Sequence, residues 1–379
     1  MAKLCSSCNL LLLVPLLFIS ALGALQYSGA NSDQTPVFFI FGDSTFDVGT
    51  NNNLLNSGAK SNFPYNGIDF ANSTPTGRFS NGFNTADQIV RLFGYEKSPQ
   101  PYLTLVQDPS TFKTNILHGV NFASGGAGIL DATGNQTYGE VVSMGQQVQQ
   151  FQLVQGNITE VLGPDAAAHF LCKSLFLISI GSNDIFDHYR YNRDTVSQQQ
   201  LMASLNSTYY AHLKNLFNLG ARKFGIVSIP PIGCCPYARL QNTTTTGGLP
   251  GCLTELNDDA QAFQLMVASL LEGLKYELNH EFKYSLGDVY TMTNIMLGNP
   301  GKFGGFKDAV MACCGKGQLN AKKPCNISEN PNLCPNRSEY VFWDMFHPTE
   351  HAAGLVAETL YDGFSPIVVP MNFSQLAQI

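Results

Sequence analysis

Runs of apolar residues alternate along the chain with stretches of helical periodicity. Five apolar runs are predicted as strands: Val37–Phe41, Ile116–Ala123, Ser174–Ile180, Lys223–Ile229 and Lys283–Val289. Helical spacing predicts helices at Gly82–Phe93, Gly145–Leu162, Gln198–Leu219 and Leu256–Asn279, and a last helix from Pro348 to about Tyr361. Continuous apolar strands separated by helices predict a parallel sheet that is covered on both faces.

Two segments do not follow this alternation and are expected to be loops. Asn242–Gly251 is rich in threonine and glycine, whereas Gly298–Arg337 is rich in glycine, lysine and asparagine and holds four cysteines. The chain shows no internal repeat and no linker long enough to separate domains. We therefore expect residues 31–379 to form one α/β domain, a three-layer α/β/α sandwich around a mostly parallel five-stranded sheet.

Polar residues or glycines follow the first three predicted strands at the points where those strands end. Ser44 closes the stretch "VFFIFGDS", Gly125 and Gly126 lie in "NFASGGAGIL", and Asn183 lies in "LISIGSNDIF". In an open parallel sheet, ligands bind outside the carboxyl ends of the strands. These loops are therefore predicted to converge at one edge of the sheet, with Ser44 as a candidate nucleophile.

A serine nucleophile needs a base, and His347 is the best placed of the seven histidines. It lies in "VFWDMFHPTEH", where Pro348 favours the first turn of a helix and leaves His347 at a loop-to-helix junction. Asp344, three residues earlier, can orient the imidazole and stabilise its protonated form. The ordinary interpretation of an Asp-x-x-His pair on its own is a helix-capping pair.

The same region also contains a candidate metal-ligand set, formed by Asp344, His347 and His351. The metalloprotease motif has a glutamate directly after its first histidine, whereas Pro348 stands there in this chain. We therefore expect neither a metal nor another cofactor. The chain also lacks the G-x-G-x-x-G and P-loop motifs of nucleotide-binding proteins and the G-x-S-x-G elbow of α/β-hydrolases.

A tetrahedral intermediate needs hydrogen-bond donors for its oxyanion. The candidates are the Ser44 backbone N–H, the Asn183 side-chain amide and the backbone N–H of Gly125 or Gly126, since glycine lets a backbone approach closely. Each has an ordinary alternative, because "SGGAG" can be a tight turn and "GSND" the N-cap of a helix. Together, however, Ser, Gly, Asn and His occur in that order, each after an apolar strand or before the last helix.

At this point the chain resembles the plant secreted branch of the GDSL esterase/lipase family, the SGNH hydrolases. Four long blocks carry the resemblance: "FGDSTFDVGTNN", "GVNFASGGAGILDATG", "GSNDIFDHY" and "VFWDMFHPTEHAA". The stretches "PTGRFSNG", "IPPIGCCP" and "ACCG" also resemble that branch. The resemblance covers nearly the whole mature chain and implies the flavodoxin-like fold of these hydrolases.

Carried over by position, the resemblance implies a serine esterase or lipase that hydrolyses carboxylic ester bonds. The implied catalytic triad consists of Ser44, Asp344 and His347. The implied oxyanion hole consists of Ser44, Asn183 and one glycine of the second block, for which Gly125 is preferred to Gly126. The branch usually has other residues at Thr45, Thr50 and His351, but none of these differences removes a catalytic group.

The same residues leave other activities open. A triad can pass the acyl group to a hydroxyl instead of water, which would make the protein an acyltransferase acting on lipid or cell-wall esters. A secreted binding protein without turnover is a third alternative, although no catalytic residue type is missing. The expected partner is an ester substrate: a lipid, an acylated sugar or another small ester.

The N-terminus predicts export. Lys3 precedes a short apolar stretch over residues 10–19, and small residues follow. We interpret residues 1–30 as a signal peptide, with an alternative cleavage point near residue 24. No later stretch is apolar enough to span a bilayer, so a stable membrane span is not expected.

Cysteines and glycosylation motifs agree with export. The mature chain keeps an even number of cysteines, as disulfides formed in an oxidising compartment would give: Cys172, Cys234, Cys235, Cys252, Cys313, Cys314, Cys325 and Cys334. Eight Asn-x-Ser/Thr motifs are candidate glycosylation sites: Asn72, Asn135, Asn157, Asn206, Asn242, Asn326, Asn336 and Asn372. Together they predict an extracellular protein of the apoplast or cell wall.

Composition refines the picture only slightly. Hydrophobic residues make up 44% of the 379 residues, which is enough for a large core. Charged residues make up 13%, about half of the roughly 25% usual for soluble proteins. The net charge of −7 argues against a nucleic-acid partner, which would require a basic surface.

Overall fold

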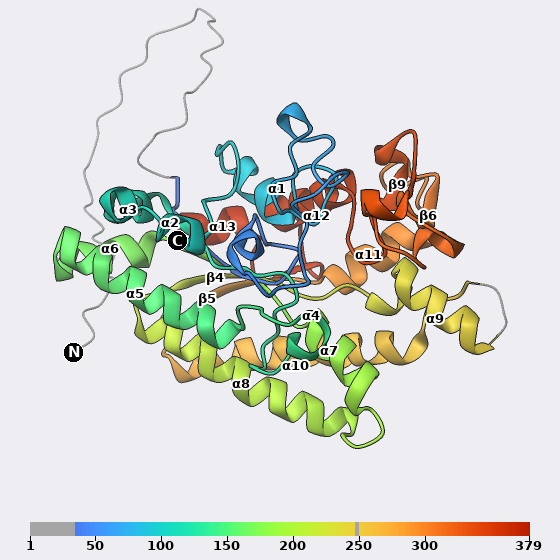
Figure 1. Cartoon of the computed structure of the whole chain (residues 1–379). Coiled ribbons are helices and arrows are strands. Elements are labelled where there is room, and N and C mark those ends of the chain that lie inside the picture. The colour runs from blue at the N-terminus through green and yellow to red at the C-terminus, as the bar shows by residue number, and fades with distance from the viewer. Residues whose placement is uncertain (1–34, 247–249) are drawn as a thin grey trace, which may run out of the picture.

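A computed structural model describes residues 35–246 and 250–379 (Figure 1). The predicted signal peptide lies outside the described residues. A central sheet lies between two layers of helices, with α5, α8 and α10 on one side and α1, α12 and α13 on the other (Figure 1). The predicted α/β class with a mostly parallel sheet is therefore confirmed.

The sheet has six strands in the described part of the chain, in the order β10–β5–β4–β3–β1–β2. All neighbours pair in parallel except β10, which is antiparallel to β5. The strands are β1 (Phe38–Gly42), β2 (Val120–Asn121), β3 (Leu175–Ser179), β4 (Lys223–Val227), β5 (Lys283–Gly287) and β10 (Val368–Val369). Apart from β10, this is the 2-1-3-4-5 order of flavodoxin-like folds, in which the order reverses between β1 and β3.

The strand count and the second strand differ from the sequence-based prediction. The edge strand β10 is only two residues long, too short to give an apolar pattern of its own. The run predicted as a strand over Ile116–Ala123 begins instead as a turn at Ile116–His118. Gly119 then adopts a φ of +97°, which an L-residue rarely takes, and only Val120–Asn121 pair with β1.

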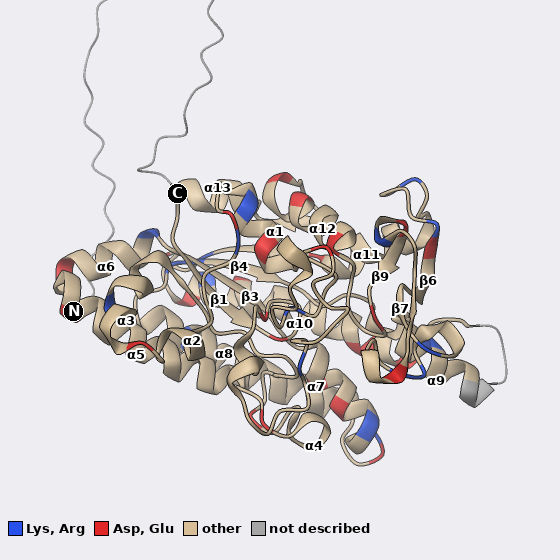
Figure 2. Ribbon diagram, turned by 45° about the horizontal axis from the view of Figure 1, so that its top comes forward, with Lys and Arg blue, Asp and Glu red and all other residues tan. Residues whose placement is uncertain are grey.

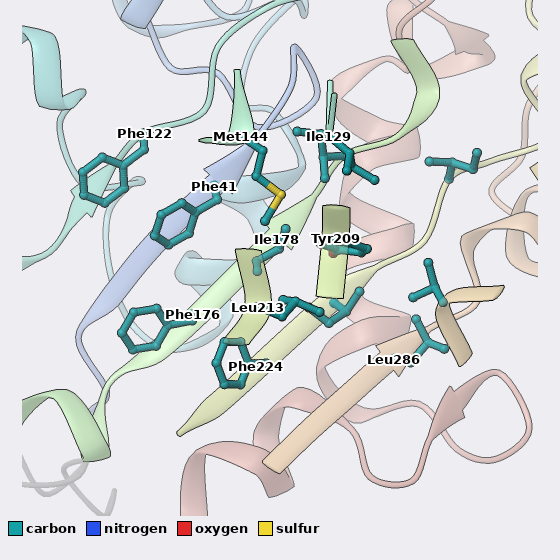
Figure 3. Close-up of a cluster of buried hydrophobic side chains, with 14 of the residues drawn as sticks. Phe41, Phe122, Ile129, Met144, Phe176, Ile178, Tyr209, Leu213, Phe224 and Leu286 are labelled. Atoms are coloured by element: carbon teal, nitrogen blue, oxygen red, sulfur yellow. The ribbon is translucent and has the colours of Figure 1, made fainter. Parts of the chain in front are cut away.

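Long helices cover one face of the sheet: α5 (Met144–Leu162), α6 (Pro164–Lys173), α8 (Gln198–Asn218) and α10 (Thr254–Glu277). Ser143 and Ser197 begin α5 and α8 with capping boxes, in which serine and a glutamine at the third helical position bond to each other's backbone. Figure 3 shows the core beneath these helices, where Phe41, Phe176 and Phe224 from three neighbouring strands face Tyr209 of α8.

On the opposite face lie α1 (Thr85–Leu92), α12 (Glu350–Asp362) and α13 (Phe373–Gln378). They cover a second core that includes Phe38 and Leu177, which point away from the first core because side chains alternate along a strand. The remaining α-helices are α2 (Tyr102–Leu105), α3 (Pro109–Asn115), α4 (Asn135–Tyr138), α7 (Ser182–Asp187), α9 (Pro236–Thr246) and α11 (Val289–Gly298).

The two predicted loops have different outcomes. The Asn242–Gly251 segment is partly helical, because α9 starts at Pro236 and continues through Thr246. The Gly298–Arg337 segment is largely irregular, as expected, with short strands β6 (Asp308–Ala312), β7 (Cys314–Gly315) and β8 (Asn332–Leu333); β9 (Tyr340–Phe342) follows and pairs with β6.

Disulfides stabilise this irregular region. Cys313–Cys334 and Cys314–Cys325 close it around the fully buried Trp343, and a third disulfide joins Cys234 to Cys252. Cys235, in contrast, is a buried free thiol. The expectation that all eight cysteines of the mature chain would pair is therefore wrong at Cys235.

Acidic and basic residues are few in the described part of the chain and are scattered over several elements (Figure 2). None of the eight candidate glycosylation asparagines is buried; the most exposed ones are Asn72, Asn135, Asn206 and Asn336, and the other four are half-buried. Among the residues that the structure describes, no helix combines the length and apolarity needed to cross a membrane.

Candidate active site

Ser44 is held in a tight turn directly after β1. Every residue of this strand is buried, and the Asp43 backbone N–H donates to the Ser179 carbonyl of β3 at 3.1 Å. Gly42 permits this approach, because a Cβ there would lie 2.4 Å from the Ser179 oxygen. The buried Asp43 side chain accepts hydrogen bonds from the backbone and hydroxyl of Thr45. The turn therefore presents Ser44 at the point where the strand order reverses.

The structure brings Ser44, His347 and Asp344 into one chain of hydrogen bonds. His347 Nε2 lies 2.7 Å from Ser44 Oγ, although the two residues are 303 positions apart. His347 Nδ1 lies 2.9 Å from both carboxylate oxygens of Asp344. Because a carboxylate can only accept, Nδ1 carries the imidazole proton and Nε2 is left to accept from the Ser44 hydroxyl.

Asp344 is built to remain ionised. Burial favours its neutral form, but the neighbouring His347 and hydrogen bonds to the carboxylate outweigh burial and lower the pKa of Asp344 below its usual value. The backbone N–H groups of Phe346 and His347 both donate to Oδ1 at 2.8 Å. These contacts fix the carboxylate beside the imidazole, and Phe79 lies against the ring with a centroid separation of 5.0 Å.

The candidate oxyanion donors lie on either side of the turn. The Asn183 amide, at the start of α7, donates to the Ala127 carbonyl at 3.0 Å, and Asn183 and Gly126 line the same cavity as Ser44. Gly125 points elsewhere, since its N–H donates to Asp47 at 2.8 Å. Within residues 35–246 and 250–379, the backbone N–H groups of Ser44 and Gly126 donate no hydrogen bond.

Asp47 connects the Ser44 turn to the glycine loop. Its fully buried carboxylate accepts from the N–H groups of Gly49 and Thr50, each at 2.7 Å, in addition to Gly125. Burial raises the pKa of Asp47 to about 6, although these hydrogen bonds oppose the effect. The peptide between Ser124 and Gly125 is thus held by a carboxylate, and the next peptide leads to Gly126, which has a φ of +84°.

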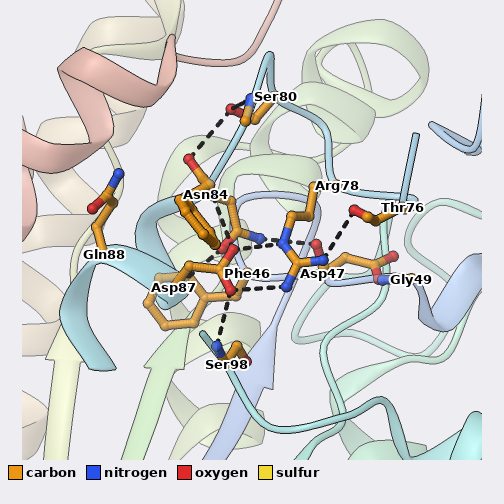
Figure 4. Close-up of polar contacts among 12 residues, drawn as sticks. Phe46, Asp47, Gly49, Thr76, Arg78, Ser80, Asn84, Asp87, Gln88 and Ser98 are labelled. Atoms are coloured by element: carbon orange, nitrogen blue, oxygen red, sulfur yellow. Dashed lines mark hydrogen bonds and ion pairs between the residues drawn. The ribbon is translucent and has the colours of Figure 1, made fainter. Parts of the chain in front are cut away.

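A buried ion pair holds the segment that carries Phe79. Figure 4 shows the Arg78 guanidinium between Thr76 and Asp87, with Asn84 and Ser98 completing the cluster. Arg78 meets both carboxylate oxygens of Asp87, at 2.6 and 2.8 Å, and both side chains are almost fully buried. A bidentate pair of this kind fixes both position and orientation. It places the neighbouring Phe79 against His347.

Ser44, Asn183 and His347 open into one cavity of about 290 Å³. Ala59 and Pro324 contribute to its wall, the latter from the loop predicted over Gly298–Arg337, and α11 and α12 contribute as well. The cavity wall is largely apolar. A cavity of this kind with a few convergent polar groups is typical of a small-ligand site.

His351 does not join the other two members of the candidate metal set. Its Nε2 lies 2.9 Å from the Gly304 carbonyl, and its ring packs against Phe306. In the part of the chain that the structure describes, no three His, Cys, Asp or Glu side chains are grouped so that they could hold a metal ion.

Sequence reasoning assigned no role to Asp47, Phe79 or the Arg78–Asp87 pair. Asp47 lies in the quoted block "FGDSTFDVGTNN", and Arg78 and Phe79 lie in "PTGRFSNG". The motifs therefore marked the positions of these residues but not their contacts. Their roles depend on long-range hydrogen bonds and ring packing, which no local pattern reports.

Comparison with known proteins agrees with this geometry. The sequence profile of the family described as GDSL-like Lipase/Acylhydrolase matches residues 38–360. The chain belongs to this family. It is 36% identical over 374 residues to the Arabidopsis thaliana protein named GDSL esterase/lipase At5g55050, covering 97% of this chain and 96% of the relative. It is 34% identical over 365 residues to GDSL esterase/lipase LTL1 of the same plant, covering 95% and 96%.

The GDSL esterase/lipase resemblance seen in the sequence is therefore confirmed, and the chain is a carboxylic ester hydrolase. The four blocks that carried the resemblance all lie within the matched residues. Three of these blocks supply Ser44, Gly126 and Asn183 to the same cavity, and the fourth supplies Asp344 and His347 from the segment before α12.

Proposed function

We propose that the enzyme is a secreted serine esterase whose catalytic triad is Ser44, His347 and Asp344. The continuous hydrogen-bonded chain through these three residues is the observation that carries the proposal. Ser44 Oγ attacks the carbonyl carbon of the ester while His347 Nε2 takes its proton. Asp344 holds the ring in the required tautomer and stabilises the imidazolium that forms.

The tetrahedral intermediate carries its negative charge on the former carbonyl oxygen. The proposed donors to this oxygen are the backbone N–H groups of Ser44 and Gly126 and the amide of Asn183. Gly126 replaces Gly125 in this assignment, because the Gly125 N–H is occupied by Asp47 and only Gly126 lines the cavity.

The second half of the reaction reverses these roles. His347 gives its proton to the departing alkoxide, which leaves an acyl group on Ser44. Water then enters, gives a proton to His347 and attacks the acyl carbon. When this second tetrahedral intermediate breaks down, the bond from the acyl carbon to Ser44 Oγ breaks, His347 returns its proton to Ser44 Oγ, and the carboxylic acid is released. Since no step requires a metal or another cofactor, this chain's own residues account for the complete cycle.

We also propose that the mature enzyme acts outside the cell. Three described disulfides and eight Asn-x-Ser/Thr motifs, none with a buried asparagine, support this location. Peptide mapping of the secreted protein would test it by identifying the first residue of the mature chain and the glycosylated asparagines. A mature chain that still begins at Met1 would contradict the proposed signal cleavage.

The triad is tested by hydrolysis of p-nitrophenyl esters by secreted wild-type enzyme and by Ser44→Ala. We expect kcat to fall by at least about 10³-fold in the variant, because the nucleophile is lost while the fold is retained. Circular dichroism and thermal unfolding of both proteins provide the control for folding. Equal, substantial rates from both proteins would exclude Ser44 as the nucleophile.

A further inference from the structure

The cavity around Ser44 is lined by two chemically different groups of residues. One group belongs to the loops beside the glycine block and includes Lys60, Ser61 and Tyr138. Gly58 N–H donates to the Tyr138 carbonyl at 2.6 Å, which joins the two segments that supply this group. The group offers an ammonium, a hydroxyl and a phenol, and is therefore suited to a polar part of a substrate.

The second group is apolar and comes from the ends of the strands and the two helices near them. Val227 ends β4, Val289 and Met296 lie on α11, and Ala353 and Val356 lie on α12. The polar atom nearest in sequence, the Ser228 hydroxyl, already accepts a hydrogen bond from the Val289 N–H at 2.9 Å. This part of the wall therefore offers mainly hydrocarbon contact.

This apolar group lies deep in the molecule although it borders an open cavity. Ala353 is 1% exposed, Val227 5% and Met296 6%. Buried side chains that border empty space lose contacts on one side, and an apolar ligand restores them. The hydroxyls of Ser228 and Thr293 are the polar side-chain groups that line the cavity here, and two hydroxyls do not compensate the desolvation of a charged group.

We propose that the wall formed by Val227, α11 and α12 binds the acyl chain of an aliphatic ester, and that Ala353 sets the length of chain accepted. This proposal rests on the esterase function and names its substrate class: esters of unbranched fatty acids of medium length, with the polar alcohol part at the Lys60 side. Ala353 shares with Ala352 the smallest side chain among the helical residues that line this cavity, so it leaves space that the chain can occupy.

The position of α12 relative to the base makes this assignment geometrically reasonable. The Thr349 side chain caps α12 two residues after His347, and the Thr349 hydroxyl also donates to the Tyr340 carbonyl at 2.8 Å. The Trp343 N–H donates to the His347 carbonyl at 2.8 Å. His347 and the start of α12 thus belong to one rigid segment, and a change at Ala353 enters the cavity without displacing the base.

The proposal is tested with p-nitrophenyl esters from acetate to dodecanoate, which share one leaving group and differ only in the acyl chain. Each methylene that enters the apolar wall should raise kcat/KM about fourfold, since burying one methylene is worth about 0.8 kcal/mol. The rise should stop when the wall is filled. A wild-type series that is flat from acetate to dodecanoate would overturn the proposal.

Two opposite substitutions locate the chain. Ala353→Leu adds three carbons to the cavity, so we expect the optimum to move at least two methylenes shorter, with about a 15-fold or greater loss of kcat/KM for longer esters relative to acetate. Met296→Ala removes side-chain atoms from the apolar wall and should move the acyl-chain length of highest kcat/KM to longer chains. Ala168→Leu, on the exposed face of α6, is the matched control and should keep the wild-type profile.

The outcomes separate this proposal from the esterase function itself. If Ser44→Ala abolishes turnover but neither Ala353→Leu nor Met296→Ala moves the chain-length optimum, the triad stands and the acyl wall is wrong. If these variants instead change selectivity among acetates of different alcohols, the wall binds the alcohol part and the proposal is overturned. If Ser44→Ala retains turnover, the function on which the proposal rests fails first.

Discussion

Replacement of Asp47 by asparagine should separate activity from stability in this enzyme. The carboxylate receives three backbone N–H groups at 2.7 to 2.8 Å, one of them from Gly125. Asparagine has the same size but only one acceptor oxygen. If that oxygen keeps the contacts to Gly49 and Thr50, the amide nitrogen faces the Gly125 N–H, and two donors meet.

Two opposing effects set the stability of Asp47→Asn. An unpaired buried N–H costs about 1–3 kcal/mol. The ionised carboxylate, however, is itself costly: the difference between a pKa of about 6 and the ordinary 3.8 is worth about 3 kcal/mol, since one pKa unit is about 1.4 kcal/mol. Asparagine avoids this cost at neutral pH. We therefore expect the free energy of unfolding at pH 7.5 to change by less than about 2 kcal/mol.

The pH dependence has a definite sign. Because burial raises the pKa of Asp47 in the folded state, its contribution to stability is fully present below pH 3.8 and is lost as pH rises through about 6. The stability of Asp47→Asn relative to wild type should therefore improve by about 3 kcal/mol between those values. Urea unfolding at several pH values measures this difference, and the exposed Asp362→Asn serves as the matched control.

Activity should respond differently from stability. Without the contact to Asp47, the glycine loop no longer holds the Gly126 N–H in position. We therefore expect kcat to fall by about 10²-fold, which is the smaller of the losses in kcat typical when one oxyanion donor is removed. Steady-state kinetics of the folded variant provide the measurement. A wild-type kcat in the variant would show that Asp47 does not position the oxyanion hole. A difference in the free energy of unfolding between the variant and wild type that does not change with pH would show that the Asp47 carboxylate is not a destabilising buried charge.

Two further substitutions or modifications follow from buried groups. Arg78→Met leaves the Asp87 carboxylate buried without its partner, so it should lower the free energy of unfolding by about 3–5 kcal/mol, as measured by urea titration. The double variant Arg78→Met, Asp87→Leu should recover much of this loss. Equal losses in the single and the double variant would refute this account. Burial raises the pKa of the Cys235 thiol to about 12. Iodoacetamide should therefore label Cys235 only after the enzyme is unfolded, as measured by peptide mass spectrometry. Rapid labelling of the native enzyme would contradict the burial of this thiol.

The sequence located the residues of the proposed triad better than it located the residues around them. Ser44 and His347 stand at the ends of clear elements, and a strand end and a helix start are places that local patterns locate well. Asp47 was not recognised, because its role is to accept a hydrogen bond from Gly125, 78 positions away. The choice between Gly125 and Gly126 depended on that same contact.

The fold shows a similar division. The long helices α5, α8 and α10 agree with their predicted ranges to within about two residues, because their apolar spacing extends over many turns. The shortest elements, such as α4 and β10, did not have enough residues for a pattern. For α9, a threonine-rich composition indicated a loop, yet Pro236 starts a helix that packs against β6 and buries Thr243. These tertiary contacts override the weak helix propensity.

The two edges of the central sheet have a consequence for how the protein behaves at high concentration. An exposed sheet edge is a template for pairing with another molecule, and aggregation begins at long, flat edges. Here the outer strands β2 and β10 are two residues each, Pro370 follows β10 directly, and Pro101 forms a bridge with Asn121 beyond β2. A neighbouring molecule would find almost no free strand to extend. An enzyme of low surface charge can therefore remain dispersed without relying on electrostatic repulsion.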